Sequence, residues 1–192
     1  MKKTFLVSLC ALFFGVLALN AASLDAKKAK ISFGAFKTID KALVKGSFDD
    51  IKLQFGKDNS SIKGVLEGAT AVIDTAKINL GDDVKNENLT NFFFAYFKKD
   101  KDAKSLIKVK FENVIEGKDK GTILANITMN GVDRRVPLQY NIKDGKLSAI
   151  GTIDLLDFSL DNAYKKLIEG CEELHEGVTW TQVELYFEAP IK

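Results

Sequence analysis

Few side chains in this sequence have the type and spacing that nucleophilic chemistry requires. Cys171 and the only histidine, His175, lie four residues apart, and a thiol beside an imidazole is one arrangement that activates a cysteine nucleophile. No third group that would orient the imidazole is evident in the sequence. A buried and inert thiol is therefore the simpler interpretation of Cys171.

Other catalytic and cofactor-binding patterns are missing. The sequence has no HExxH or CxxC spacing, no GxSxG elbow, no Walker loop and no dinucleotide fingerprint. Paired carboxylates occur at Asp49-Asp50 and Asp82-Asp83, but each pair ends an apolar run, where a solvated turn explains it. We therefore expect no enzyme, no metal site and no cofactor other than a bound ligand.

The N-terminal segment has the order of a secretory signal peptide. Lys2 and Lys3 precede an apolar run from Phe5 to Leu19, and the small residues Ala21 and Ala22 follow. This run is shorter than the ~20 residues that a membrane-spanning helix needs. We expect a signal peptide over residues 1–22 and one domain over residues 23–192, periplasmic or secreted and without stable membrane insertion.

Cleavage of that signal changes both the cysteine count and the charge. Cys10 is removed, so Cys171 has no intrachain partner and is buried, free or paired between chains. A homodimer is therefore one alternative. Loss of Lys2 and Lys3 leaves 26 basic and 26 acidic residues. A net charge of zero does not favour nucleic acid as a partner.

From about residue 29 onward, apolar and polar residues alternate with period two, which is typical of β-strands with one buried face. Asn130-Gly131 and Asp144-Gly145 are two-residue hairpin signals that join neighbouring runs. Eight strands of this kind require two packed sheets or a closed barrel. The runs are 42–55, 61–67, 70–79, 105–116, 122–129, 132–142, 146–155 and 178–189.

Two segments have helical spacing instead. Residues 85–97 place apolar side chains on one helical face, with Asn86 or Asn88 as the N-cap, and residues 161–174 begin with Asp161 as a cap. The successive residues Phe92, Phe93 and Phe94 cannot all face one core. We therefore expect at least one of them to be exposed or to touch a ligand at the mouth of the barrel.

The inward-facing positions of the strands are mainly Ile, Val, Leu and Phe, without clustered carboxylates or histidines. An apolar cargo is the only ligand class that this pattern favours. Periodicity alone does not distinguish a ligand cavity from a core filled by its own side chains. Arg134 has the parity of the inward residue Val136 and is one candidate for a polar group that could act on a bound lipid. The favoured alternative is a charge that reaches solvent at the mouth of the hairpin.

Several segments, taken in order, resemble the YceI-like family of exported lipid-binding proteins from about Ile31 to the C-terminus. Residues 121–138, GTILANITMNGVDRRVPL, are similar to the family's "G-x-L-t-i-x-G-v-t-k-x-V" hairpin. Residues 44–48 are similar to its "v-x-G-x-F" strand, and residues 156–160 to its "R-x-d-F-g-i" segment, with Leu155 in place of arginine. Residues 85–89, KNENL, depart from the family's "R-D-x-H-L" and keep only the leucine.

This resemblance implies an all-β protein: an eight-stranded antiparallel lipocalin-like barrel with one or two short inserted helices. It also implies a long apolar channel for an isoprenoid, an isoprenoid quinone or a fatty-acid-like lipid. A structural or interaction module with a self-filled core is the alternative. The predicted ligand-binding wall comprises Phe48, Leu89, Phe92, Phe93, Tyr96, Phe97, Ile107, Val109, Phe111, Ile127, Val136, Leu138, Tyr140 and Phe158.

Overall fold

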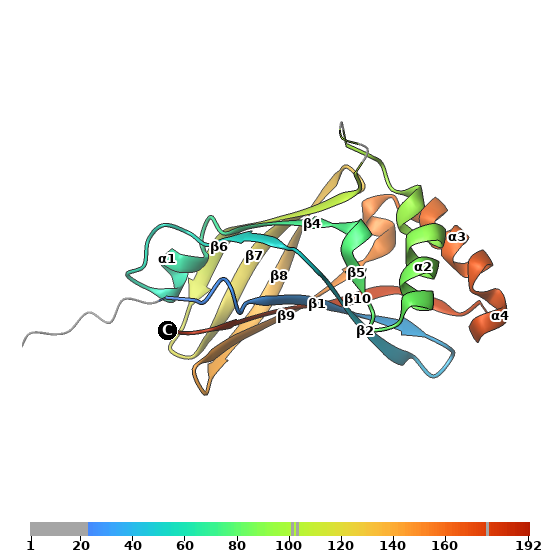
Figure 1. The fold of residues 1–192 in the computed structure, drawn as a ribbon. Helices are drawn as coiled ribbons and strands as arrows, with labels where there is room; N and C mark the ends of the chain where they lie inside the picture. Colours follow the sequence, from blue (N-terminus) through green and yellow to red (C-terminus); the bar gives the residue numbers. More distant parts are fainter. Residues whose placement is uncertain (1–22, 101, 103, 176) are drawn as a thin grey trace, which may run out of the picture.

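Ten strands form one antiparallel sheet in the computed structural model, which describes residues 23–100, 102, 104–175 and 177–192 (Figure 1). The expected signal peptide lies outside the described residues. The strands are β1 (Lys30–Lys37), β2 (Ala42–Phe48), β3 (Lys52–Gln54), β4 (Thr70–Asp74), β5 (Ile78–Asn79), β6 (Leu106–Glu116), β7 (Lys120–Met129), β8 (Val132–Lys143), β9 (Lys146–Asp154) and β10 (Thr179–Pro190).

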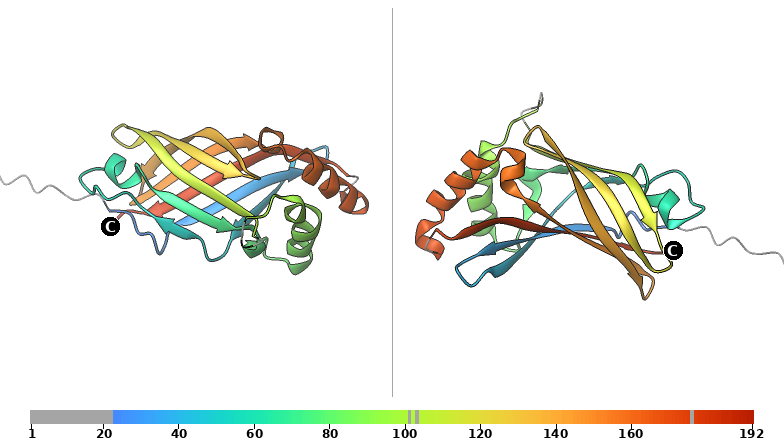
Figure 2. Two further views of the ribbon diagram at one scale, coloured as in Figure 1. Left: turned by 90° about the horizontal axis from the view of Figure 1, so that it is seen from above. Right: turned by 180° about the vertical axis from the view of Figure 1, so that it is seen from behind.

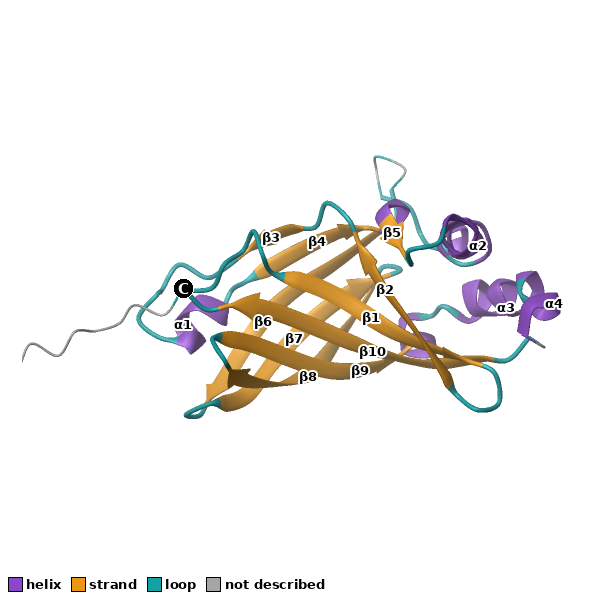
Figure 3. Cartoon of the chain, turned by 60° about the horizontal axis from the view of Figure 1, so that its bottom comes forward, coloured by secondary structure: helices purple, strands orange, loops and turns teal. Residues whose placement is uncertain are grey.

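The sheet order is β3-β4-β6-β7-β8-β9-β10-β1-β2-β5, and its two edges meet. β2 continues into β3 after a break at residues 49–51, and β4 continues into β5 after the 3₁₀ turn η1 (Thr75–Lys77). β2 pairs with β5 while β3 pairs with β4. The backbone N–H of Asp49 donates to the carbonyl of Lys77 at 2.8 Å and bridges the break. Residues 42–55 and 70–79 thus form a closure seam, along which the curled sheet closes into a lipocalin-like barrel (Figure 3).

Eight chain segments build this barrel, but they differ in two places from the eight runs expected. Residues 61–67 were predicted as a strand and this is wrong. They form the helix α1 (Ile62–Leu66), because the Ser61 hydroxyl caps the backbone N–H of Gly64 at 3.0 Å and the chain buries Ile62, Val65 and Leu66. The eighth segment is instead β1, which the prediction omitted although its residues alternate.

The antiparallel meander of β6 to β9 confirms the predicted hairpins. Asn130 and Gly131 have φ angles of 53° and 77°, and Asp144 and Gly145 of 52° and 70°. These left-handed conformations are those that two-residue hairpin turns require. The meander supplies four neighbouring strands of the barrel wall, and β10 pairs with the last of them after the helices that follow β9.

Helices cover both ends of the barrel, with α1 at one end and the remaining helices at the other (Figure 2). The latter are α2 (Asp83–Phe92), η2 (Phe94–Tyr96), η3 (Leu155–Phe158), α3 (Asp161–Gly170) and α4 (Glu172–His175). The carboxylate of Asp82, rather than Asn86 or Asn88, caps α2. Asp161 is the first residue of α3 and not its cap. No helix in the described part of the chain is long and apolar enough to cross a membrane.

Asn130 fastens the helical end to the β7–β8 hairpin. Its side-chain amide donates to the carbonyls of Phe158 and Ser159 at 3.1 and 2.9 Å, and its Oδ1 accepts from the backbone N–H of Lys98 at 2.9 Å. The side chain is buried. One turn residue therefore anchors both the segment after η2 and the segment before α3.

We predict that Asn130→Ala lowers the free energy of unfolding by about 2–4 kcal/mol, because buried backbone groups lose their partners and alanine is strained at positive φ. Asn130→Gly is the matched control, since glycine tolerates this φ but makes no side-chain hydrogen bond. Denaturant titration should place the glycine variant between wild type and the alanine variant. Equal stability of all three proteins would contradict the anchoring role.

Cys171, at the end of α3, is a free and buried thiol, as the simpler interpretation expected. Burial raises the pKa of its thiol above the usual value. A disulfide between two chains would require this side chain to leave the interior. The side chain of His175 lies outside the described part of the structure.

We predict that Cys171 reacts slowly with iodoacetamide in the folded protein at neutral pH, because the thiolate is the reactive form and burial disfavours it. Unfolding in urea should raise the rate by at least about tenfold. Mass spectrometry of the alkylated protein measures both rates. Equally fast labelling before and after unfolding would show that the thiol is accessible.

An apolar cavity inside the barrel

The barrel contains a cavity of about 100 Å³. Its lining comes from nine of the ten strands or from residues just before them, so that segments from both ends of the domain contribute. The lining residues are Ile31, Ser32, Phe33, Phe48, Leu53, Ala69, Thr70, Ala71, Ile73, Ile107, Val109, Phe111, Ile127, Met129, Leu138, Ile153, Leu185, Tyr186 and Phe187.

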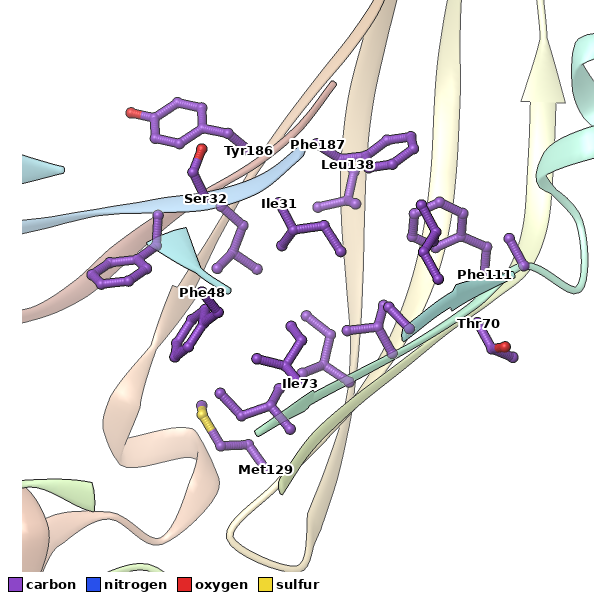
Figure 4. Close-up of a pocket in the computed structure, with 18 of the residues that line it drawn as sticks. Ile31, Ser32, Phe48, Thr70, Ile73, Phe111, Met129, Leu138, Tyr186 and Phe187 are labelled. Carbon is purple, nitrogen blue, oxygen red and sulfur yellow. The ribbon is translucent and has the colours of Figure 1, made fainter. Parts of the chain in front are cut away.

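The polar side chains among these residues do not face the cavity. Figure 4 shows the hydroxyls of Ser32 and Tyr186 directed away from it. Ser32 and Tyr186 are paired in register and share the outward parity of β1 and β10, whereas Ile31 and Phe187 have the inward parity. The Tyr186 hydroxyl donates to the carboxylate of Glu184, which raises the pKa of Tyr186 to about 12. The surface that a ligand would meet is therefore hydrocarbon.

Aromatic rings lie toward both ends of the cavity. At one end the ring centroid of Phe187 lies 5.6 Å from that of Phe111 and 6.3 Å from that of Phe55. At the other end the Phe48 ring lies 6.1 Å from Phe94. Phe93, Phe94 and Phe97 form a cluster with centroids 5.0–5.2 Å apart. We call these three residues the aromatic plug.

Six of the fourteen predicted wall residues line the cavity. They are Phe48, Ile107, Val109, Phe111, Ile127 and Leu138. Their ligand-binding role stays a prediction, because the structure gives their position alone. Figure 4 shows Phe48 with Ile73 and Met129 toward one end of the cavity, and Phe111 with Thr70 toward the other.

The other eight predicted residues lie outside the cavity lining. Val136, Tyr140 and Phe158 are buried, and Tyr140 packs beside Gly121. The Tyr140 hydroxyl has no hydrogen-bond partner among the described residues, and burial raises its pKa. Phe158 lies where the backbone is held by Asn130.

The predicted residues of the 85–97 segment lie in or behind the aromatic plug. Phe93 and Phe97 are buried in it, Leu89 and Phe92 are half-buried, and Tyr96 is 42% exposed. None of the three successive phenylalanines is exposed, so of the two expected alternatives only contact with a ligand stays a prediction. The α-helix ends at Phe92 and a 3₁₀ turn begins at Phe94, so the chain changes direction there. The rings of Phe93 and Phe94 are buried and that of Phe92 is half-buried.

Phe92 covers α3, where Gly170 leaves room for its ring: a Cβ at this glycine would lie 2.3 Å from the Phe92 Cγ. Phe94, the member of the trio that the predicted wall omitted, contacts the cavity-lining Phe48. The segment therefore closes the mouth of the barrel without lining the cavity.

Arg134 reaches solvent at the mouth of the β7–β8 hairpin, which confirms the favoured alternative over an inward role. It is exposed near the start of β8, and its guanidinium donates to the backbone carbonyl of Asp133 at 2.9 Å. Within the described residues, no cluster of three or more His, Cys, Asp or Glu side chains has the geometry to hold a metal ion.

The sequence prediction missed lining residues at both ends of the domain. Ile31 and Phe33 were missed because β1 was omitted, although their alternation with Lys30 and Ser32 is a period-two signal. Ala71 and Ile73 follow the same signal in β4. Leu185 and Phe187 share the inward parity of the predicted 178–189 run, but the predicted wall did not include them.

In the segment where this sequence departs from the family's motif, Asn86 has a local structural role. Its Oδ1 accepts a hydrogen bond from the backbone N–H of Leu80 at 2.8 Å, and its carbonyl accepts one from the Thr90 hydroxyl at 2.8 Å. The Asn86 side chain thus ties residue Leu80, which precedes α2, to the first turn of that helix.

An antiparallel barrel, covered by short helices and closed around an apolar cavity, defines the lipocalin-like class of all-β proteins. Within that class the chain belongs to the YceI-like domain family, whose model matches residues 23–189. A search of curated proteins finds no match.

Solved structures with the same fold include three from different bacteria. A polyisoprenoid binding domain from Saccharophagus degradans is 20% identical with a TM-score of 0.60, covering 90% of this chain and 98% of its own. BcnA from Burkholderia cenocepacia is 17% identical with a TM-score of 0.59, covering 88% and 99%. The YceI protein of Campylobacter jejuni is 20% identical with a TM-score of 0.57, covering 79% and 86%. At these identities the likeness concerns the fold.

We predict that Ala71→Leu fills part of the cavity. Ala71 is buried, lines the cavity and lies on the closure seam opposite Leu53. Binding of an apolar fluorescent dye should weaken by about tenfold or more, while stability changes by less than about 1 kcal/mol because the added side chain enters existing space. Fluorescence titration and thermal unfolding measure the two effects.

Val72→Leu is the control, because it adds a methylene group to the neighbouring residue on the opposite face of β4. Dye affinity should stay at the wild-type value in this variant. Equal losses in both variants, or none in either, would mean that the dye binds elsewhere.

Proposed function

We propose that this protein binds an isoprenoid, an isoprenoid quinone or a fatty-acid-like lipid in the barrel cavity and sequesters or carries it in the periplasm or outside the cell. The observation that carries the proposal is the barrel cavity, whose inward surface is almost entirely apolar among the described residues. Removing hydrocarbon from water contributes ~0.8 kcal/mol for each buried CH₂ group. Such a cavity therefore binds an apolar chain without any polar contact along it.

Family membership supports the same proposal. The Saccharophagus degradans structure of this fold is described as a polyisoprenoid binding domain. A signal peptide over residues 1–22 and a balanced charge fit a carrier that leaves the cytoplasm and meets no nucleic acid. We propose that catalysis plays no part in this role.

The size of the cavity sets a condition on the ligand. Its volume of about 100 Å³ is small beside the roughly 300–1,000 Å³ of typical small-molecule sites. A long chain therefore requires side chains to move. Met129 is suited to this because its unbranched thioether adapts to irregular space, and the Phe48 ring lies at the boundary with the aromatic plug.

The same small volume favours a second candidate, a structural or interaction module whose core is filled by its own side chains. In that case inward residues such as Ile107, Ile127 and Leu185 serve only packing. The two candidates differ in whether the purified protein holds or takes up a lipid.

We predict that the mature protein, purified without detergent, has an intact native mass that exceeds its denatured mass by one long-chain lipid. Extraction and mass spectrometry of the released compound give its class. A protein that is unliganded and also fails to take up isoprenoid quinones, isoprenoid phosphates and fatty acids would contradict lipid binding and support the self-filled module.

A further inference from the structure

The β1–β2 hairpin carries apolar side chains that the fold leaves uncovered on the outer side of the barrel. Ile39, in the turn of the hairpin, is 75% exposed, Leu43 is 45% exposed, and Trp180 at the start of the adjacent strand β10 is 36% exposed. Phe36 is paired in register with Leu43 and shares its face. We call Phe36, Ile39, Leu43 and Trp180 the hairpin patch. Grouped exposed apolar side chains, unlike scattered ones, mark an interaction site.

Hydrogen bonding and ring contacts join the members of this patch. The indole N–H of Trp180 donates to the backbone carbonyl of Thr38 at 2.9 Å, which ties β10 to the turn of the hairpin. The ammonium group of Lys41 lies 4.8 Å from the ring centroid of Phe36 and 4.9 Å from that of Trp180. Two aromatic rings therefore flank one positive charge, and Ile39 projects from the turn that the indole holds.

The hairpin is also basic, although the mature sequence as a whole has a balanced charge. Residues 30–48 contain four lysines and one aspartate. None of these lysines forms an ion pair with another described residue. Lys41 and Lys45 lie on the outer face, where the Lys45 Nζ is 5.6 Å from the ring centroid of Tyr186. The positive charge of the hairpin is therefore available to a negatively charged partner.

The carboxylates that β10 places beside the hairpin are already engaged. Glu184 accepts a hydrogen bond from the Tyr186 hydroxyl, and Glu188 pairs with Lys146 at 2.9 Å. Asp40, in the turn, is the one acidic residue of the hairpin itself. This part of the outer surface thus combines a net positive charge with exposed aromatic and aliphatic side chains.

We propose that the hairpin patch docks the protein reversibly on an anionic lipid surface. Tryptophan favours the boundary between hydrocarbon and water, because its ring is apolar and its N–H is polar. Lysines beside such a ring are attracted to anionic head groups. A nucleic acid would meet the lysines but would offer no hydrocarbon to Ile39 and Leu43. The combination of charge and apolar surface therefore favours a membrane.

The position of the patch fits a protein that exchanges its cargo with a membrane. The turn of the β1–β2 hairpin lies at the helical end of the barrel, which the aromatic plug closes (Figures 1 and 3). Docking would bring this end of the barrel to the lipid surface. The inference goes beyond binding in the cavity, and phospholipid vesicles test it without a cavity ligand. Docking and cavity binding can therefore fail independently of each other.

Trp180 reports on docking directly, because it is the only tryptophan in the sequence. The test follows its fluorescence while the mature protein is titrated with vesicles of phosphatidylcholine and phosphatidylglycerol in equal parts, or of phosphatidylcholine alone. The anionic vesicles should shift the emission to shorter wavelength and bind at least about tenfold more tightly than the neutral ones. High salt should weaken this binding, because salt screens exposed lysines.

One pair of variants tests the apolar contact. Ile39→Asn removes the most exposed side chain of the patch and should weaken binding to anionic vesicles by about tenfold. Ile115→Asn is the matched control, because Ile115 is 71% exposed near the opposite end of the barrel, at the end of β6. This control should bind as wild type does. Thermal unfolding shows that each variant is folded.

A second pair tests the charge. Lys45→Gln should weaken binding to anionic vesicles by about fivefold, because each lysine near the surface adds to the attraction. Lys110→Gln removes an exposed lysine from β6 and should leave the affinity unchanged. If both lysine variants bind equally weakly, net charge rather than the hairpin is responsible and the proposal is wrong.

The remaining outcomes are also decisive. If the anionic vesicles neither shift the emission nor sediment with the protein, the patch does not dock on lipid. Equal binding to both kinds of vesicle would overturn the preference for an anionic surface. Equal losses in Ile39→Asn and Ile115→Asn would place the contact elsewhere. An emission shift that grows with protein concentration in the absence of vesicles would show that a second copy of the chain covers the patch instead.

Discussion

The closure seam between residues 42–55 and 70–79 is the contact on which the rest of the structure depends. Without it the sheet would have two unpaired edges, which invite pairing with other chains, and its apolar face would be open to water. Each of the two chain segments in the seam is interrupted, but the seam holds. β2 pairs with β5 on one side of the interruption and β3 with β4 on the other, and the backbone hydrogen bond from Asp49 to Lys77 bridges it. Closure converts a one-sided sheet into a barrel with an interior.

The seam also positions the apolar cavity. Phe48, Ala71 and Ile73 face inward from it and line the apolar cavity. Where the segment leaves β4, Asp74 and Thr75 face a second pocket instead. The 3₁₀ turn that interrupts the strand therefore separates the apolar cavity from a more open pocket lined by Asp74, Thr75 and Ser105.

The sequence predicted those parts of the fold in which local signals agree. Alternation and the Asn130-Gly131 and Asp144-Gly145 turns located the meander, where each strand is long and paired with its neighbour in the chain. The prediction from the sequence was wrong at residues 61–67. A helix of five residues has too few turns for its apolar spacing to be distinguished from that of a strand. The break at residues 49–51 did have a signal in Asp49-Asp50, where Asp50 adopts a φ of 56°, but the run was read through it.

The candidate site was less predictable than the fold. Parity assigned inward faces correctly for Ile107, Val109 and Phe111, but it does not tell which inward residues border a void and which pack against one another. Val136, Tyr140 and Phe158 are inward and buried without lining the cavity. The second pocket joins residues around 75, 90 and 105, which only the closed barrel brings together, so no spacing in the sequence announces it.

The register between β1 and β10 carries a consequence for the order of folding. The meander pairs residues that are close in the chain, whereas Ile31 faces Phe187 across nearly the whole length of the domain. Contacts between distant residues carry a larger entropic cost and form more slowly than local ones. We therefore expect the β6–β9 hairpins to form early and the β1–β10 pairing to form late. During that interval the nascent barrel is a trough, and a hydrophobic chain could enter it sideways before the last strand seals the wall.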